Sequence, residues 1–294
     1  MSAPCPISYY IDCNRLSDEL RRCYFSELAD NGGKYVVLNY EMFQNIMRSP
    51  GSMNAYAKEL ADAGLQFADA HAPCGGVFDL HNTGNFEMNK MLMYYKLYIR
   101  IAAALNISTL TFHVGSDNML PELSSEEHTA RICRMLDGIL PEAEEYGVIV
   151  ALENSWARSN SADSLLKLKA LYPTDNLGFC FDSGHANLAS RTGNYLQSPA
   201  WERWKAVGYE EPIWENNTLE KLLPHIVNCH LHDNDGTADI HQLPGWGNID
   251  WKKTVSLLRK APRLKVIQSE VKHFRHCIAI KDLVNTFEKL FADN

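Results

Sequence analysis

Short apolar segments alternate with longer amphipathic segments along almost the whole chain. The longer segments carry apolar residues at helical spacing, as in residues 16–32, 88–106 and 124–147. The short segments are typical of strands, and we expect eight of them, beginning near Ile7, Tyr35, Gln66, Ser108, Val148, Leu177, Ile226 and Lys265. A repeated strand–helix unit of this kind predicts an α/β fold, a closed parallel (β/α)8 barrel.

The size and composition of the chain agree with one such barrel. The chain has 294 residues, of which 46% are hydrophobic and 22% charged, so it can bury one full core. We therefore expect residues 1–294 to form a single barrel domain. An open doubly wound sheet is the structural alternative, but no GxGxxG motif follows the first expected strand.

The sequence also restricts compartment and partners. Residues 1–22 lack the basic start and apolar run of a signal peptide, and no apolar run of about 18 residues predicts a membrane span. The eight cysteines form no CxxC pair, which favours free thiols and a cytoplasmic location. A net charge of −8 and neutral to acidic loops at 74–85 and 115–122 disfavour binding to nucleic acid.

Histidines and carboxylates stand where six of the expected strands end. In a barrel these strand ends converge on one face, where active sites form. Ionisable side chains are rarely buried unless they are paired or bind a metal. The sequence therefore predicts a metal site built from some of His71, His113, Glu153, Asp182, His185, His230, Asp239, His241 and Glu270.

Several strings around these residues resemble motifs of the xylose-isomerase-like TIM-barrel superfamily. The strings are ALEN, FDSGH, HLHDND, DIHQLPGWGNIDW and SE, in that order, and the resemblance runs from about residue 7 to the last helix. The superfamily includes sugar isomerases and epimerases, inosose dehydratases and abasic-site nucleases of the endonuclease IV type. The resemblance thus implies a TIM barrel and a metal-dependent enzyme.

The resemblance implies two layers of site residues. The metal ligands would be Glu153, Asp182, His230 and Glu270, a donor set that suits Mn²⁺ or Zn²⁺ and also Co²⁺ or Mg²⁺. In the sugar enzymes the surrounding histidines contact substrate, whereas in the nucleases they bind further metal. Both interpretations stay open, with substrate binding favoured, for His71, His113, His185 and His241, and Asp239 joins them in a second metal site.

The favoured activity is proton transfer on a small polyhydroxylated substrate by an isomerase or epimerase. A divalent metal would stabilise the enediolate formed from the substrate, and Glu153 and Glu270 match the family's acid/base pair. The alternatives are a phosphodiesterase similar to endonuclease IV, and a lyase or dehydratase acting on an oxidised sugar or an inosose. A barrel that binds a ligand without turnover is a further alternative.

Three loop features complete the expectations. Trp246, between two glycines where many relatives have an acidic residue, and Lys272, just beyond Glu270, are expected to contact substrate. Asp250 is expected to cap a helix that starts at Trp251. An aromatic-rich insertion at about 190–217, between strands six and seven, predicts either a wall that stacks on the substrate or a subunit interface in a homo-oligomer.

Overall fold

The computed structural model describes residues 2–12, 16–81, 88–191 and 195–292. Eight parallel strands form a closed barrel in sequence order, and β1 pairs with β8 through Ile7 and Ile267 to close it. Each strand begins within one residue of its expected position, which confirms the barrel prediction. The strands are β1 (Ile7–Tyr9), β2 (Tyr35–Leu38), β3 (Gln66–His71), β4 (Thr109–Phe112), β5 (Ile149–Glu153), β6 (Leu177–Asp182), β7 (Ile226–Leu231) and β8 (Val266–Ser269).

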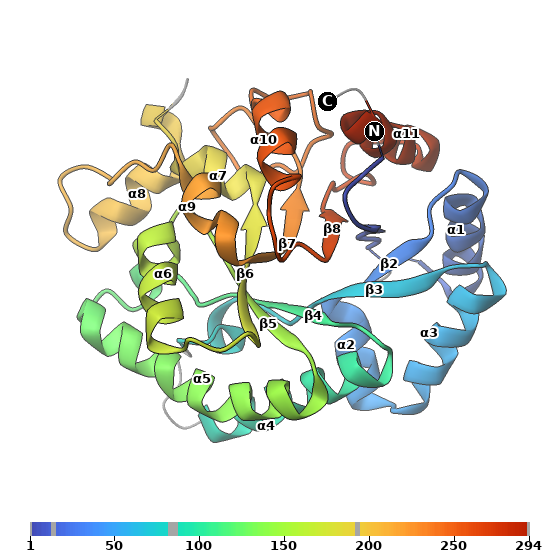
Figure 1. The fold of residues 1–294 in the computed structure, drawn as a ribbon, viewed down its shortest axis with the longest axis horizontal. Helices are drawn as coiled ribbons and strands as arrows, with labels where there is room; N and C mark the ends of the chain where they lie inside the picture. The colour runs from blue at the N-terminus through green and yellow to red at the C-terminus, as the bar shows by residue number, and fades with distance from the viewer. Residues whose placement is uncertain (1, 13–15, 82–87, 192–194, 293–294) are drawn as a thin grey trace.

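Helices surround the strands on the outside of the barrel (Figure 1). Local sequence sets both ends of helix α5. Ser124 and Glu127 form a capping box at its start, and Gly147 ends the helix in a left-handed conformation. The helices are α1 (Asp18–Asp30), α2 (Tyr40–Arg48), α3 (Gly51–Asp62), α4 (Met88–Ala104), α5 (Ser125–Tyr146), α6 (Ala162–Leu171), α7 (Ser183–Ala189), α8 (Pro199–Ala206), α9 (Thr218–Leu222), α10 (Trp251–Leu258) and α11 (Ile280–Ala292).

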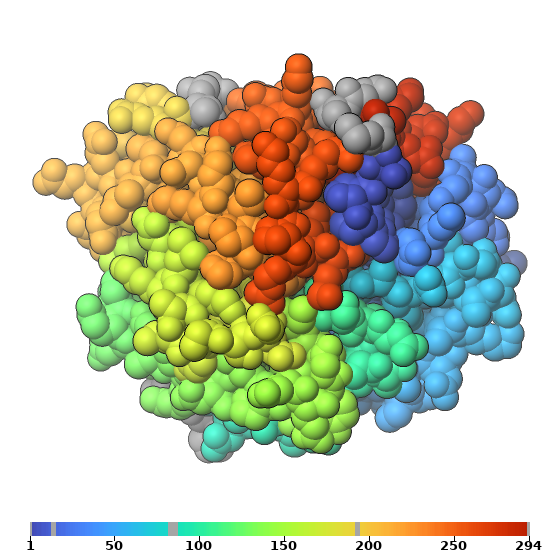
Figure 2. Space-filling view, in the orientation of Figure 1, coloured from blue at the N-terminus to red at the C-terminus, as the bar shows by residue number. Residues whose placement is uncertain are grey.

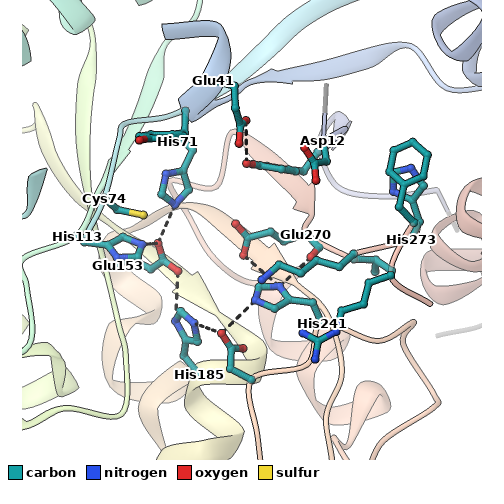
Figure 3. Close-up of a pocket in the computed structure, with 17 residues that line it drawn as sticks. Asp12, Glu41, His71, Cys74, His113, Glu153, His185, His241, Glu270 and His273 are labelled. Carbon is teal, nitrogen blue, oxygen red and sulfur yellow. Dashed lines mark hydrogen bonds and ion pairs between the residues drawn. The ribbon is translucent and has the colours of Figure 1, made fainter. Parts of the chain in front are cut away.

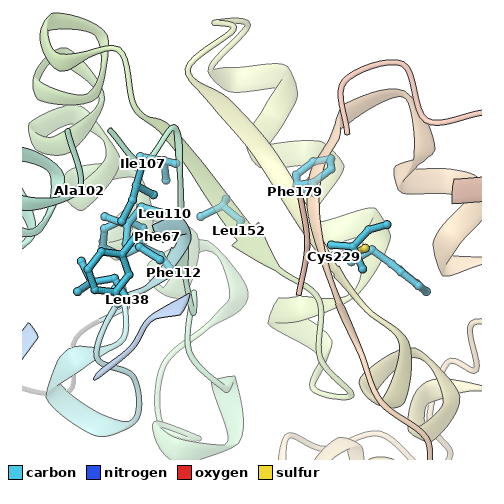
Figure 4. Packing of buried hydrophobic residues seen from close by; sticks show 14 of the residues in the cluster. Leu38, Phe67, Ala102, Ile107, Leu110, Phe112, Leu152, Phe179 and Cys229 are labelled. Atoms are coloured by element: carbon cyan, nitrogen blue, oxygen red, sulfur yellow. The ribbon is translucent and has the colours of Figure 1, made fainter. Parts of the chain in front are cut away.

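The main core lies between the strands and the helices. Alternate strand residues such as Leu110, Leu152 and Phe179 are fully buried there (Figure 4). The residues between them point into the barrel. This alternation fixes which side chains can reach the site at the carboxyl ends of the strands.

The inside of the barrel is unusually polar. Asp69, Thr111 and Asn228 are fully buried, and Thr109 donates a hydrogen bond to Asp69 at 2.7 Å. The Asn228 amide donates to the hydroxyl of Thr111 at 2.8 Å. Burial raises the pKa of the Asp69 carboxyl above its ordinary value. These strand residues form a polar layer beneath the site, which the sequence analysis did not predict.

The insertion between β6 and β7 contains the short helix α8 and lies partly at the outer edge of the molecule (Figures 1 and 2). Residues 192–194, within the predicted insertion at 190–217, fall outside the described residues. The predicted cap is confirmed, because the Asp250 side chain accepts a hydrogen bond from the Lys253 amide at the start of α10. Within the described part of the chain, no helix combines the length and apolar character needed to cross a membrane.

Candidate metal centre

The four expected metal ligands meet at the carboxyl ends of four consecutive strands. Glu153 ends β5, Asp182 ends β6, His230 lies in β7, and Glu270 follows β8. The register places Asp182 beside His230, and His230 beside Gln268, so that inward-facing side chains line up at one level. One potential ligand atom from each of the four residues lies within 4.8 Å of the other three.

His230 faces three carboxylates. Its Nδ1 lies 3.3 Å from Glu153 Oε1, 3.5 Å from Glu270 Oε2 and 4.0 Å from Asp182 Oδ2. This buried nitrogen has no hydrogen-bonding partner among the described residues. On the other side of the ring, the Thr111 hydroxyl lies 3.5 Å from Nε2. Buried polar atoms are normally satisfied, so an Nδ1 surrounded by carboxylate oxygens fits a ligand of the divalent metal that the sequence implies.

Asp182 is fixed from two directions. Its Oδ1 accepts a hydrogen bond from the His185 amide at 2.6 Å, and its Oδ2 accepts one from His232 Nε2 at 3.1 Å. The His232 ring packs against Gly184, where a Cβ would lie 2.0 Å from ring carbon Cε1. The glycine of the FDSGH string is therefore needed for close packing. His232 lies two residues after His230 in the HLHDND string, and its hydrogen bond to Asp182 was not predicted from the sequence.

Glu153 lies between two groups of histidines (Figure 3). Its Oε2 is 2.9 Å from His113 Nε2 and 3.4 Å from His71 Nε2, and its Oε1 is 3.3 Å from His185 Nδ1. Burial raises the pKa of Glu153, but the His230 and His113 imidazoles outweigh it and hold this pKa well below its usual range. Burial lowers the pKa of His113, yet Cys74 and Glu153 raise it well above its usual value.

Asp239 and His241 complete the predicted set. Asp239 Oδ2 lies 3.1 Å from His241 Nε2 and 3.5 Å from His185 Nε2. His241 Nδ1 donates to the Glu270 carbonyl at 2.9 Å. The predicted ionisable residues are thus connected through close contacts in one site. A second metal among the outer residues stays a prediction.

A cavity of about 700 Å³ opens above these residues. Glu153, Glu270 and the four predicted substrate-binding histidines line it, and so does Lys272. Trp246 is 56% exposed and does not line the cavity, and neither do the described aromatic residues of the insertion. Several other lining residues were not predicted, because they follow a strand, lie in a loop or start helix α2 without a recognisable motif: Tyr10, Asp12, Tyr40, Glu41, Cys74 and Arg275.

Comparison with known proteins identifies the family of the chain. The sequence model of the xylose isomerase-like TIM barrel family matches residues 25–275. The chain belongs to this family. Over 156 residues it is 27% identical to an uncharacterized protein of Methanocaldococcus jannaschii, and the match covers 52% of this chain and 46% of that protein. The chain thus matches about half the length of this curated relative.

Solved structures share the fold over the full length. A D-tagatose 3-epimerase-like protein superposes with a TM-score of 0.72 at 22% identity, covering 98% of both chains. The IolI protein, solved with a bound zinc atom, has a TM-score of 0.68 at 15% identity, covering 98% of this chain and 97% of its own. At these identities the likeness shows a common fold, and sugar epimerases are among the proteins that share it.

Proposed function

We propose that this protein is a divalent-metal-dependent isomerase or epimerase of sugars or sugar-like ketones. The observation that carries the proposal is the convergence of Glu153 and Glu270 on His230 Nδ1, at 3.3 and 3.5 Å, beside one cavity. The residues that would hold the metal are Glu153, Asp182, His230 and Glu270. A cation bound there would polarise a substrate carbonyl and make the adjacent C–H bond more acidic.

The two glutamates are suited to move the proton. They enter the site from β5 and β8, and each carboxylate has a second oxygen that can serve as a base. Burial raises the pKa of Glu270, but His230 outweighs it and brings this pKa below its usual range. Ionised at neutral pH, one carboxylate can take the proton from the substrate carbon. That carboxylic acid can then return the proton to the substrate, or the second carboxylate can return one that it has taken up from solvent. The Gln268 amide donates to Glu270 Oε1 at 3.3 Å and orients it.

The rest of the cavity supports a small polyhydroxylated substrate. His185 and His241 lie next to the carboxylates and can bind substrate hydroxyls or oxyanions. Farther out, the walls combine aromatic rings with both acidic and basic groups, including Tyr10, Glu41 and Lys272. Such mixed polarity suits a sugar better than a nucleic-acid backbone, whose binding depends on an excess of Lys and Arg.

The proposal is tested by proton exchange. The protein, supplied with Mn²⁺, Zn²⁺, Co²⁺ or Mg²⁺ in turn, is incubated with a panel of ketoses in D₂O, and after the metal is removed with chelator the products are read by NMR. We expect deuterium at the carbon next to the carbonyl, and loss of the exchange in Glu153→Gln and Glu270→Gln. Glu220→Gln is the matched control, because Glu220 pairs with Lys253 at the surface. Exchange that survives in both site variants would contradict the assignment.

One observation favours a second candidate function. His71 and His113 gather around the second oxygen of Glu153, which allows a second cation and hence metal-assisted phosphodiester cleavage. Cleavage of a duplex with one abasic site, without ketose exchange, would support this candidate. A lyase or dehydratase would instead be recognised in the exchange experiment by the appearance of an eliminated product.

A further inference from the structure

Trp156 contacts both the candidate site and helix α8 of the insertion. It follows Glu153 by three residues, in the loop after β5. Its ring meets the His185 ring edge-on, with centroids 4.8 Å apart and an interplanar angle of 75°. This ring contact limits where the His185 imidazole can lie. The position of this imidazole matters because His185 lines the cavity. The ring of His185 is also held by the hydrogen bond from its Nδ1 to the Asn154 carbonyl, at 3.0 Å.

Helix α8 of the insertion holds Trp156 through its backbone and through its ring. Trp204 is buried, and its Nε1 donates a hydrogen bond to the Trp156 carbonyl at 3.0 Å. The Arg203 guanidinium lies over the Trp156 ring, 5.2 Å from the centroid, in cation–π geometry. Arg203 also donates to the Asn118 side chain at 3.0 Å, which ties α8 to the loop after β4.

A second set of contacts fixes the same segment. Arg158, two residues after Trp156, pairs with the buried Asp117 at 2.7 Å. The Arg158 guanidinium lies over the Tyr209 ring at 5.3 Å, and Tyr209 meets Trp204 edge-on at 5.2 Å. The end of the insertion is therefore packed against the same loop that carries Trp156.

We propose that α8 is a brace that holds Trp156 against His185 and so sets the orientation of this imidazole. None of the described aromatic residues of the insertion lines the cavity, and Trp204 reaches the site only through its contact with Trp156. Trp156, Arg203 and Trp204 are positioning residues in this scheme. The catalytic consequence rests on the proposed function, in which His185 contacts substrate.

Two substitutions remove the brace while leaving the bulk of the side chains. Arg203→Met keeps the apolar stem without the cation, and Trp204→Phe keeps a ring without the N–H donor. Lys205→Met is the matched control, because the Lys205 ammonium lies over the Trp201 ring at 4.6 Å on the same helix and does not contact Trp156. Arg203→Lys keeps the cation and serves as the conservative variant.

We expect Arg203→Met and Trp204→Phe to lower kcat/KM for proton exchange by about 10- to 100-fold, because a displaced imidazole misplaces the substrate. Metal content should not change, since neither residue touches the four metal ligands. Lys205→Met should match the unsubstituted protein, and Arg203→Lys should recover part of the loss. Equal activity in all four variants would overturn the proposal.

A readout that is independent of activity is the ¹³C-labelled histidine ring of His185, identified by its loss in His185→Asn. The nearby Trp156 ring should shift this signal through its ring current, and Arg203→Met and Trp204→Phe should move or broaden it while Lys205→Met does not. If these signals move but neither the unsubstituted protein nor any variant catalyses proton exchange into a ketose, the positioning role of α8 is supported and the proposed function is wrong. An unmoved His185 signal in the folded brace variants would overturn the brace itself.

Discussion

At the scale of single residues, Gly184 shows how close packing supports the site. A Cβ at this position would overlap the His232 ring, whose nitrogen holds Asp182. We expect Gly184→Ala to displace His232 and to weaken metal binding by about 10- to 100-fold, the usual effect of losing a hydrogen bond to a ligand. Isothermal titration with Mn²⁺ measures this affinity.

The control for this substitution is Gly51→Ala at the start of α3, where a Cβ would meet no atom within 4 Å. We expect it to leave the metal affinity unchanged. The role assigned to Gly184 would be wrong if both alanine variants bound Mn²⁺ equally well.

His81 gives a prediction about pH. It is fully buried, and neither ring nitrogen has a hydrogen-bonding partner among the described residues. Burial lowers its pKa below the ordinary value of 6.5. The unfolded chain therefore binds more protons than the folded protein at mildly acidic pH. The free energy of unfolding is thus unaffected by His81 protonation above the pKa of the unfolded chain, and it declines as the pH falls below that pKa.

We expect His81→Leu to flatten this dependence. The unfolding free energies of the two proteins, measured with urea between pH 5 and 8, should differ in slope below about pH 6.5. Histidines far from position 81 contribute equally to both curves, so the difference reports His81 together with His128, whose ring centroid lies 5.6 Å from that of His81. Parallel curves would show that His81 is not buried in its neutral form.

At the scale of elements, Asn154 joins the ends of two neighbouring strands. Its amide donates to the Asp182 carbonyl at 3.1 Å and accepts from the Asp182 amide at 2.9 Å. We expect Asn154→Ala to lower the unfolding free energy by about 1–3 kcal/mol, because two buried backbone groups lose a partner. It should also weaken metal binding, because Asp182 loses part of its support.

Asn176→Ala separates these two effects. Asn176 precedes β6, at the end of this strand away from the site. Its side-chain amide donates to the carbonyls of Ala143 and Val148. We expect this variant to lose stability as well, measured by urea denaturation, but to keep its metal affinity in titration. Equal metal affinities in the two variants would show that Asn154 does not support the metal site.

The elements also show what sequence can predict. An apolar run that ends in His, Asp or Glu fixes a strand end and a site residue together, so Glu153 and Asp182 could be placed from sequence. The polar interior could not, because Asp69 and Asn228 each interrupt an apolar strand singly and their partners lie on other strands. The contact between α8 and Trp156 depends on tertiary packing across 48 residues, for which the sequence contains no local signal.

At the scale of the whole molecule, barrel closure and the candidate site depend on each other. The four proposed metal ligands lie at the ends of the last four strands, and the first strand closes the barrel against β8. A metal that binds only the folded protein stabilises it by mass action. We expect added Zn²⁺ or Mn²⁺ to raise the melting temperature, and chelator to lower it, in thermal denaturation. The shift should vanish in His230→Ala, and a shift that persisted there would place the metal elsewhere.

The most direct test of the central claim is the metal content per chain, measured by plasma mass spectrometry on protein purified without chelator. The proposed site predicts one divalent cation per chain in the unsubstituted protein and its loss in Glu270→Ala. Two or three zinc ions per chain would favour the second candidate function. Protein that contains no metal and takes up none on titration, or an unchanged content in Glu270→Ala, would contradict the proposed site.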